Sequence, residues 1–156
     1  MAGHDEAPHG LAQLQAMSVG GSKAPMGETL GFDLVEVERG KAVFEGRPDR
    51  SVYNPRGSVH GGYAATLLDS ACGIATRSML SANRGYATLE LKVSYLRGLT
   101  DASGIVRATG RAISLDSRVA FAEAELHDGE GRLCATATST LLVFDVALKD
   151  RGAPQP

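Results

Sequence analysis

Residues 54–62 read Asn-Pro-Arg-Gly-Ser-Val-His-Gly-Gly and lead directly into a largely apolar run over residues 63–79. The run contains no proline and a single glycine, so an α-helix of about four to five turns is its natural conformation. Its apolar side chains spread over more than half of the helix circumference at about 100° per residue. They are Ala64, Leu67, Leu68, Ala71, Cys72, Ala75 and Met79. We therefore expect one helix that is buried on most sides and that organises the rest of the chain.

The polar side of this predicted helix is a narrow stripe with a single carboxylate, Asp69. The stripe also holds Thr66, Ser70, Gly73 and Arg77. Asp69 is the only acidic residue between Asp49 and Glu90, so any acid chemistry on the helix depends on it. The alternative is structural: Asp69 faces water or pairs with Arg77 two turns further along.

The glycines before the helix have the composition of a ligand site. Gly61 and Gly62 carry no Cβ, so a ligand atom can approach the main chain closely there. At a helix start their N–H groups lack intrahelical partners and lie at the positive end of the helix dipole, which suits an oxygen that gains negative charge. Asp69 follows His60 by nine positions, so the helix start and the carboxylate are on the order of 12 Å apart. One carbonyl cannot touch both groups, so a shared reaction requires two subunits.

Asn54, the His60-Gly61-Gly62 triplet and Asp69, seven residues after the second glycine, form a fairly specific combination. It resembles the hotdog-fold acyl-CoA thioesterases of the phenylacetate-degradation type, which are close to the 4-hydroxybenzoyl-CoA thioesterases. The similarity extends from about Leu30 to Val143. It implies an α+β hotdog fold, in which a curved antiparallel β-sheet wraps one long central helix. It also implies a homodimer as the minimal unit and a homotetramer as the usual state.

The resemblance implies a role for each residue in this pattern. Asp69 would act as nucleophile or as general base towards water, and the Gly61 N–H would polarise the thioester carbonyl. Asn54 and His60 would align that carbonyl, and Thr88 matches a position where some relatives place a water-positioning serine. Each of these last three residues also has an ordinary explanation. Asn54 would simply form an Asn-Pro turn, and His60 would hold the loop by hydrogen bonds. Thr88 would be an ordinary residue on the polar face of a strand.

Coenzyme A would require local cations for its phosphate groups. Arg97 is one candidate, and Arg118 or Arg111 near the following hairpin is another. Each is equally explained as a solvated charge at a strand end. Gly62 and Tyr63, directly after the loop, are candidates for contacts with the substrate, Tyr63 near its acyl end. The chain has four Phe, four Tyr and no Trp, so an aromatic acyl group is not favoured over a medium aliphatic one.

Strand-like runs account for most of the remaining chain. Residues 32–46 predict two short strands around a turn at Arg39-Gly40-Lys41, and three long runs cover residues 104–115, 118–127 and 132–144. Another strand, over residues 88–95, alternates between two faces. The pattern places Leu89, Leu91, Val93 and Tyr95 on one face and Thr88, Glu90, Lys92 and Ser94 on the other. Between the helix and this strand, Asn83-Arg84-Gly85 is expected to supply a left-handed helix stop.

Length and composition predict one domain with a substantial core. We expect a flexible segment over residues 1–28, in which Leu11, Leu14 and Met17 are spaced for a short helix. The hotdog domain should cover residues 29–146, followed by a disordered tail over 147–156. The net charge of −2 is spread over the chain, which argues against nucleic acid and anionic membranes as partners. No signal peptide or spanning segment is evident, so a cytoplasmic protein is expected.

The pattern predicts an acyl-CoA thioesterase that uses no cofactor. No group of His and Cys has metal-ligand spacing, and Cys72 and Cys134 fit reduced packing residues. One alternative is a non-catalytic acyl-CoA-binding hotdog module, which would keep the glycines but would lose the acid, and Asp69 is present. The other is a hotdog enoyl-CoA hydratase or dehydratase, which needs a histidine and an acid in a different pattern.

Overall fold

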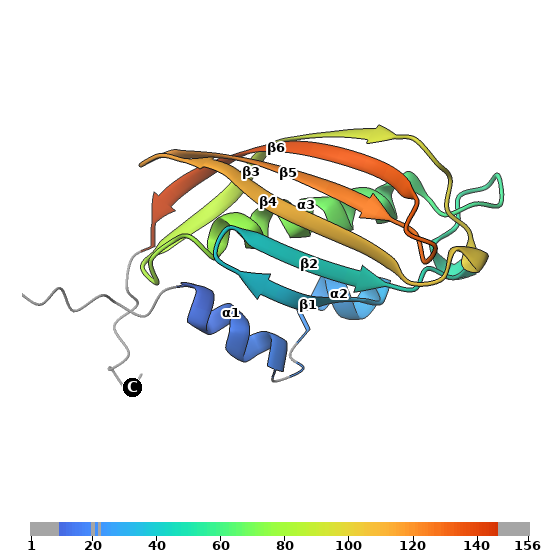
Figure 1. Cartoon of the computed structure of the whole chain (residues 1–156), viewed down its shortest axis with the longest axis horizontal. Helices are drawn as coiled ribbons and strands as arrows, with labels where there is room; N and C mark the ends of the chain where they lie inside the picture. The colour runs from blue at the N-terminus through green and yellow to red at the C-terminus, as the bar shows by residue number, and fades with distance from the viewer. Residues whose placement is uncertain (1–9, 20, 22, 147–156) are drawn as a thin grey trace, which may run out of the picture.

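The computed structural model describes residues 10–19, 21 and 23–146 of the chain. Within them an antiparallel six-stranded sheet, in the order β1-β2-β4-β5-β6-β3, curves around helix α3 (Gly61–Arg77) (Figure 1). The strands are β1 (Phe32–Glu38), β2 (Lys41–Gly46), β3 (Arg84–Tyr95), β4 (Val106–Leu115), β5 (Val119–His127) and β6 (Leu133–Asp145). This is the hotdog arrangement, so the α+β prediction is confirmed.

The sheet can wrap the helix closely because its inner face is built from small residues. The alternate residues that face α3 are mostly alanine: Ala108, Ala120, Ala122, Ala124, Ala135 and Ala137, all at most 4% exposed. Gly110 on β4 is the point of closest approach, since any side chain there would overlap the Ala71 carbonyl of the helix. In return α3 buries Leu67, Leu68 and Cys72 completely. The predicted central helix is therefore correct, and it begins and ends two residues earlier than expected.

The end of α3 differs from the prediction. The expected left-handed stop at Asn83-Arg84-Gly85 is wrong, because the helix ends at Arg77 and Gly85 lies inside β3. Ser78 ends the helix instead: its fully buried hydroxyl donates to the Ala75 carbonyl and accepts the N–H of Gly40 at 2.8 Å. The turn between β1 and β2 therefore fixes the helix end, and no local glycine signal was needed.

β3 departs from simple alternation. Thr88 pairs with Leu141 and Glu90 pairs with the next residue, Thr140, so Leu89 is one extra residue in the strand. Such a β-bulge reverses the inward and outward order of the side chains beyond it. Thr88 therefore faces α3 together with Tyr95, whereas Leu89 is 60% exposed. The prediction that Thr88 and Tyr95 lie on opposite faces is wrong for this reason.

Two short helices lie at the β1 side of the sheet. Helix α1 (Gly10–Val19) coincides with the short helix expected in the N-terminal segment, and α2 (Pro25–Leu30) precedes β1. Short 3-10 turns cover Arg50–Val52 and Asp101–Ser103. The first nine residues of the segment expected to be flexible, and the whole of the tail expected to be disordered, 147–156, lie outside the described residues. No helix in the described ranges has the length and apolar character to cross a membrane.

Candidate active site

The loop before α3 presents one open backbone N–H. His60 caps the helix, and its Nδ1 accepts the N–H of Gly62 at 2.8 Å. Because Nδ1 accepts, the ring proton of neutral His60 resides on Nε2, and this side chain is exposed. Within the described part of the chain, the Gly61 N–H has no acceptor. Of the two glycine N–H groups, the one of Gly61 is therefore available to a ligand.

Asn54 shapes the loop that leads to these glycines. Its Oδ1 accepts the N–H groups of Arg56 (2.9 Å) and Ser58 (3.3 Å), and its Nδ2 donates to the Ser58 hydroxyl (3.1 Å). Gly57 completes the turn with a positive φ of 87°. The side chain thus forms the turn that an Asn-Pro sequence favours. Its direct contact with a thioester stays a prediction.

A cavity of about 200 Å³ opens at the start of α3. Its wall includes His60 and Gly61 from the helix start, and Tyr95, Leu96 and Arg97 from the end of β3. The structure thus brings Arg97 to the same cavity as Gly61, as a site for an anionic ligand needs. Gly62 and Asp69 do not line this cavity.

Tyr95 also lines this cavity, although the alternation of the strand marked it only as a residue of the apolar face. Its hydroxyl donates to the Gly61 carbonyl at 2.7 Å. A Cβ placed on Gly61 would lie 3.0 Å from that hydroxyl oxygen and 3.1 Å from the ring. A side chain at position 61 would therefore crowd Tyr95 and oblige its ring to shift by a few tenths of an ångström, independently of any substrate. In the sequence, the feature that pointed to Tyr95 was its position at a strand end, two residues before the candidate phosphate ligand Arg97.

Asp69 lies half-buried on α3, and its partner comes from β3. The Thr88 hydroxyl donates to Asp69 Oδ1 at 2.9 Å, so the structure brings these two predicted residues together. Arg77, the alternative partner of Asp69, instead donates to the Gln13 side chain at 3.0 Å and to carbonyls just after the helix. One carboxylate oxygen of Asp69 is thus held by a neutral hydroxyl. The alternative pair with Arg77 does not form among the described residues.

The two cysteines near these residues are unsuited to nucleophilic chemistry. Burial, followed by the nearby charge of Asp69, raises the pKa of the Cys72 thiol to about 12. Burial also raises the pKa of Cys134, which lines the cavity at the helix start. Both thiols therefore stay protonated near neutral pH, and the reactive thiolate form is absent.

The candidate cations for coenzyme A do not gather at one place in a single chain. Arg118 lies in the turn before β5, where Val119 pairs with Leu142, whereas Arg97 follows Tyr95, which pairs with Ala135. Seven residues of β6 separate these pairs, or about 23 Å. Arg97 alone lies at the Gly61 cavity.

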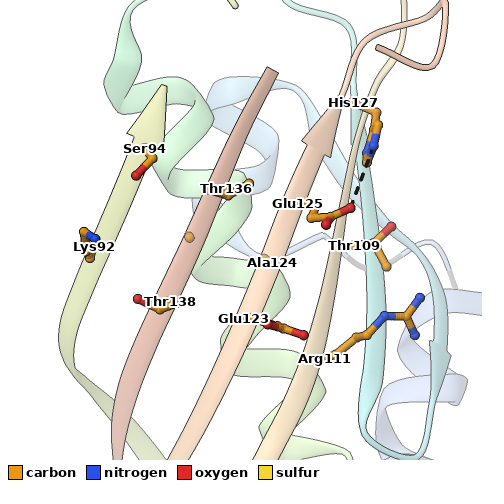
Figure 2. Close-up of a pocket in the computed structure, with 11 residues that line it drawn as sticks. Lys92, Ser94, Thr109, Arg111, Glu123, Ala124, Glu125, His127, Thr136 and Thr138 are labelled. Atoms are coloured by element: carbon orange, nitrogen blue, oxygen red, sulfur yellow. Dashed lines mark ion pairs between the residues drawn. The ribbon is translucent and has the colours of Figure 1, made fainter. Parts of the chain in front are cut away.

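Arg111 lies elsewhere, in a groove of about 660 Å³ on the outer face of the sheet. Arg111 pairs with Glu123 of the neighbouring strand, and Figure 2 shows its guanidinium directed away from that carboxylate, with Lys92 across the strands. Glu125 is paired with His127 at 3.8 Å. This face carries charges of both signs, so it is poorly suited to a run of phosphates.

Tyr63 is placed in the core. Only 3% of the residue is exposed, and burial raises the pKa of its hydroxyl to about 12. The hydroxyl lies against Gly46 of β2, and within the described residues it has no hydrogen-bond partner. Tyr63 is not part of the wall of the cavity at the helix start. A contact with the acyl end of a substrate stays a prediction.

Comparison with known proteins identifies the family of this chain. Residues 56–135, just over half of the chain, match the thioesterase superfamily. The 1,4-dihydroxy-2-naphthoyl-CoA hydrolase of Listeria monocytogenes is 28% identical over 116 residues, which cover 74% of this chain and 93% of that enzyme.

Solved structures agree. A phenylacetic acid degradation-related protein from Ralstonia eutropha is 27% identical, with a TM-score of 0.72 over 82% of this chain and 97% of that one. The Escherichia coli PaaI protein, at 18% identity, shares the fold with a TM-score of 0.75 over 85% of this chain and 94% of its own. The chain therefore belongs to the thioesterase superfamily and is a thioester hydrolase of the hotdog fold.

Proposed function

We propose that the chain hydrolyses an acyl-CoA thioester to a free acid and coenzyme A, at a site shared by two copies. One observation carries the proposal: a single edge strand, β3, holds both halves of the site. Thr88 near its start binds the carboxylate of Asp69, and Tyr95 at its end binds Gly61 beside the open N–H. One of the relatives, the Listeria monocytogenes enzyme, is a named acyl-CoA hydrolase, which supports this substrate class.

Within one copy the two halves are too far apart to act together. Gly61 and Asp69 are eight residues apart on α3, which is about 12 Å along the helix axis. Among the described strands, β3 has β6 as its one neighbour, so its other side is available for a strand from a second copy. Antiparallel pairing about a two-fold axis near Leu91 and Lys92 would set Thr88 opposite the second copy's Tyr95. Asp69 of one copy then approaches Gly61 of the other.

The exposed side chains on this edge favour such a contact. Leu89, Tyr95 and Leu96 are 57–60% exposed, although all three are large and apolar. Pairing through β3 would bury part of that surface and satisfy the open backbone groups. We therefore take the homodimer as the minimal active unit and a homotetramer of two such dimers as the assembled state. Two free, buried cysteines, Cys72 and Cys134, fit the reducing cytoplasm as its location.

The reaction uses the two halves in different ways. The thioester oxygen accepts the Gly61 N–H at the positive end of α3, which stabilises the oxyanion as the carbonyl carbon is attacked. Asp69 of the partner subunit removes a proton from water while the water oxygen bonds to that carbon. The C–S bond then breaks, and the sulfur of coenzyme A leaves with a proton. The other route is direct attack by Asp69, which gives an anhydride that water hydrolyses.

The neighbouring residues align the groups that react. The hydrogen bond from Thr88 fixes one oxygen of Asp69 and leaves the other free for water or the carbonyl. The exposed Nε2–H of His60 can donate to the carbonyl from the same loop, and Asn54 keeps that loop in shape. Arg97 on the same cavity can bind a phosphate of coenzyme A. Thiol release from a panel of acyl-CoAs determines which acyl group is preferred.

The first test is thiol release from a panel of aliphatic and aromatic acyl-CoAs. Asp69→Asn keeps an acceptor for Thr88 but removes the base or nucleophile, so kcat should fall about 10³-fold. Glu38→Gln, which removes an exposed carboxylate paired with Lys41 at the β1–β2 turn, is the matched control and should keep full activity. Unchanged turnover in Asp69→Asn would refute the assignment. Binding without thiol release by the wild type would identify a binding module instead.

A mixing experiment tests the shared site. Asp69→Asn and Gly61→Val are each expected to be inactive, the latter because its side chain blocks the open N–H and collides with Tyr95. Random co-assembly makes half of the dimers mixed, and each mixed dimer holds one intact site, so about a quarter of wild-type activity should return. No recovery, or an active monomer by light scattering, would show that one copy contains the whole site.

A further inference from the structure

We propose that Tyr95 is a positioning residue that, together with His60, locks the peptide between Gly61 and Gly62. The carbonyl of this peptide accepts the Tyr95 hydroxyl at 2.7 Å, and its N–H donates to His60 Nδ1 at 2.8 Å. Both polar ends of one peptide unit are thus held by side chains from two different segments. The inference rests on the proposed function, because its purpose is to aim the adjoining Gly61 N–H at the thioester oxygen.

A lock is needed because this part of the helix has little stiffness of its own. Two consecutive glycines have wide conformational freedom, and Gly61 and Gly62 have no Cβ to limit it. They also occupy the first turn of α3, where the N–H groups lack intrahelical acceptors. Without the two side-chain partners of the Gly61–Gly62 peptide, φ and ψ of Gly61 would be free to change, and the direction of the Gly61 N–H relative to the helix would change with φ. Restraint from outside the helix is therefore what preserves the donor.

The strand end delivers the Tyr95 hydroxyl from a rigid base. Tyr95 pairs with Ala135, and the N–H groups of the next two residues, Leu96 and Arg97, both donate to the Cys134 carbonyl at 2.8 and 3.0 Å. The backbone around Tyr95 is thus fixed to β6 even though its side chain is 57% exposed. The ring also lies against Gly61, where a Cβ would come within 3.0 Å of the hydroxyl oxygen and would force a small shift of the ring. The glycine and the tyrosine are therefore matched to each other.

The test is Tyr95→Phe, which keeps the ring and removes the hydroxyl. Loss of one hydrogen bond to the helix start should lower kcat about tenfold while KM stays within about twofold, because the donor is misaligned but the cavity wall remains. Hydrogen exchange of the Gly62 amide should accelerate, since the peptide is then held at one end only. Tyr53→Phe is the matched control: it removes a tyrosine hydroxyl that bonds to Asp101, and both readouts should match wild type.

Three results would overturn the proposal. A wild-type kcat in Tyr95→Phe would show that the hydroxyl does not align the donor. A raised KM with unchanged kcat would make Tyr95 part of the substrate wall only. Unchanged exchange at Gly62 would show that the peptide is not locked by the hydroxyl, and this readout applies even if the wild type releases no thiol. In that case the proposed function fails, while faster exchange would still establish the lock.

Discussion

The two edges of the sheet differ in how far the rest of the described chain covers them. At the β1 edge the chain covers itself: α1 packs against β1, Leu14 is 6% exposed, and the Gly10 N–H donates to the Leu80 carbonyl at 3.0 Å. At the β3 edge the described residues supply no such cover. Large apolar side chains there, including Leu89 and Leu96, are 60% exposed.

The contrast indicates that the β1 edge serves mainly the stability of the fold, whereas the β3 edge serves mainly the candidate active site. Exposed strand edges invite pairing with another chain, so proteins usually cover or charge them. Among the described residues, no hydrogen bond joins the β1 edge to Gly61 or Asp69, whereas the open β3 edge supplies a hydrogen-bond partner to each, Tyr95 to Gly61 and Thr88 to Asp69. Changes at the β3 edge should therefore alter activity first, and changes at the β1 edge should alter stability first.

Deletion of Leu89 should have the largest effect on the β3 edge. Without the extra residue, restoring the ladder with β6 turns Thr88 and Tyr86 away from α3. Asp69 loses its hydrogen bond and Tyr86 loses its packing against Gly73. We expect kcat to fall on the order of 10²-fold or more and the free energy of unfolding to fall by roughly 2–4 kcal/mol.

Leu89→Ala is the control for the deletion, because it keeps the bulge and removes only an exposed side chain. Its free energy of unfolding should stay within about 0.5 kcal/mol of wild type. Thiol-release kinetics and denaturant unfolding measure both variants. Full activity after the deletion would mean that the bulge does not orient Thr88.

Leu14→Ala should break the β1 edge without touching the site. Removing this buried side chain leaves a void between α1 and β1, which should lower the free energy of unfolding by about 2–3 kcal/mol. The value of kcat at a temperature where the variant is folded should stay within about twofold. Met17→Ala on the same helix, 46% exposed, is the control and should change stability much less. A large loss of kcat in Leu14→Ala would erase the distinction between the edges.

Thr88→Val is a smaller change, confined to one hydrogen bond at the β3 edge. Valine keeps the shape of threonine but cannot donate to Asp69, so kcat should fall about tenfold, which corresponds to about 1.4 kcal/mol. Thr88→Ser restores the donor and should recover most of the activity. The comparison of kcat for the three proteins decides the matter, and equal values would leave Thr88 a strand residue only.

The smallest expected effect concerns the two cysteines, which should hardly react with a thiol reagent in the folded protein. Because burial raises the pKa of Cys72 to about 12 and also raises the pKa of Cys134, both thiols stay protonated near neutral pH in the folded protein. Labelling with a thiol reagent should be slow in the native state and rapid in denaturant. Rapid native labelling of Cys134, which lines the cavity beside Tyr95, would show that this end of the β3 edge opens on its own.

The sequence predicted the parts of the fold that depend on local periodicity. The apolar run gave α3 within two residues, and alternation located β4, β5 and β6 within two residues at each end. The glycine turn between β1 and β2 was also correct, with Gly40 at a φ of 77°. Residue type and spacing marked Asp69 and Gly61 as candidates, because a lone carboxylate on an apolar helix and a glycine pair before it are local features. Thr88 became a candidate only through the family resemblance.

The errors all involve contacts between distant segments. The helix stop was misplaced because Ser78 is held by Gly40, thirty-eight residues away in the chain. The face of Thr88 was wrong because a bulge is a property of the pairing with β6 and leaves no fixed mark in one strand. Tyr95 was missed because its hydroxyl matters only once the end of β3 lies beside Gly61.

By itself, the sequence predicted the central helix, most of the strands, the family pattern and the chemical groups available: one carboxylate on the helix, two glycine N–H groups at its start and three candidate arginines. These follow from side-chain periodicity and from the presence or absence of a Cβ, which are local properties. Only the tertiary structure decided which of them meet. It paired Asp69 with Thr88, locked Gly61–Gly62 between His60 and Tyr95, and left the β3 edge open, because register, bulges and strand order arise from pairing across the whole sheet.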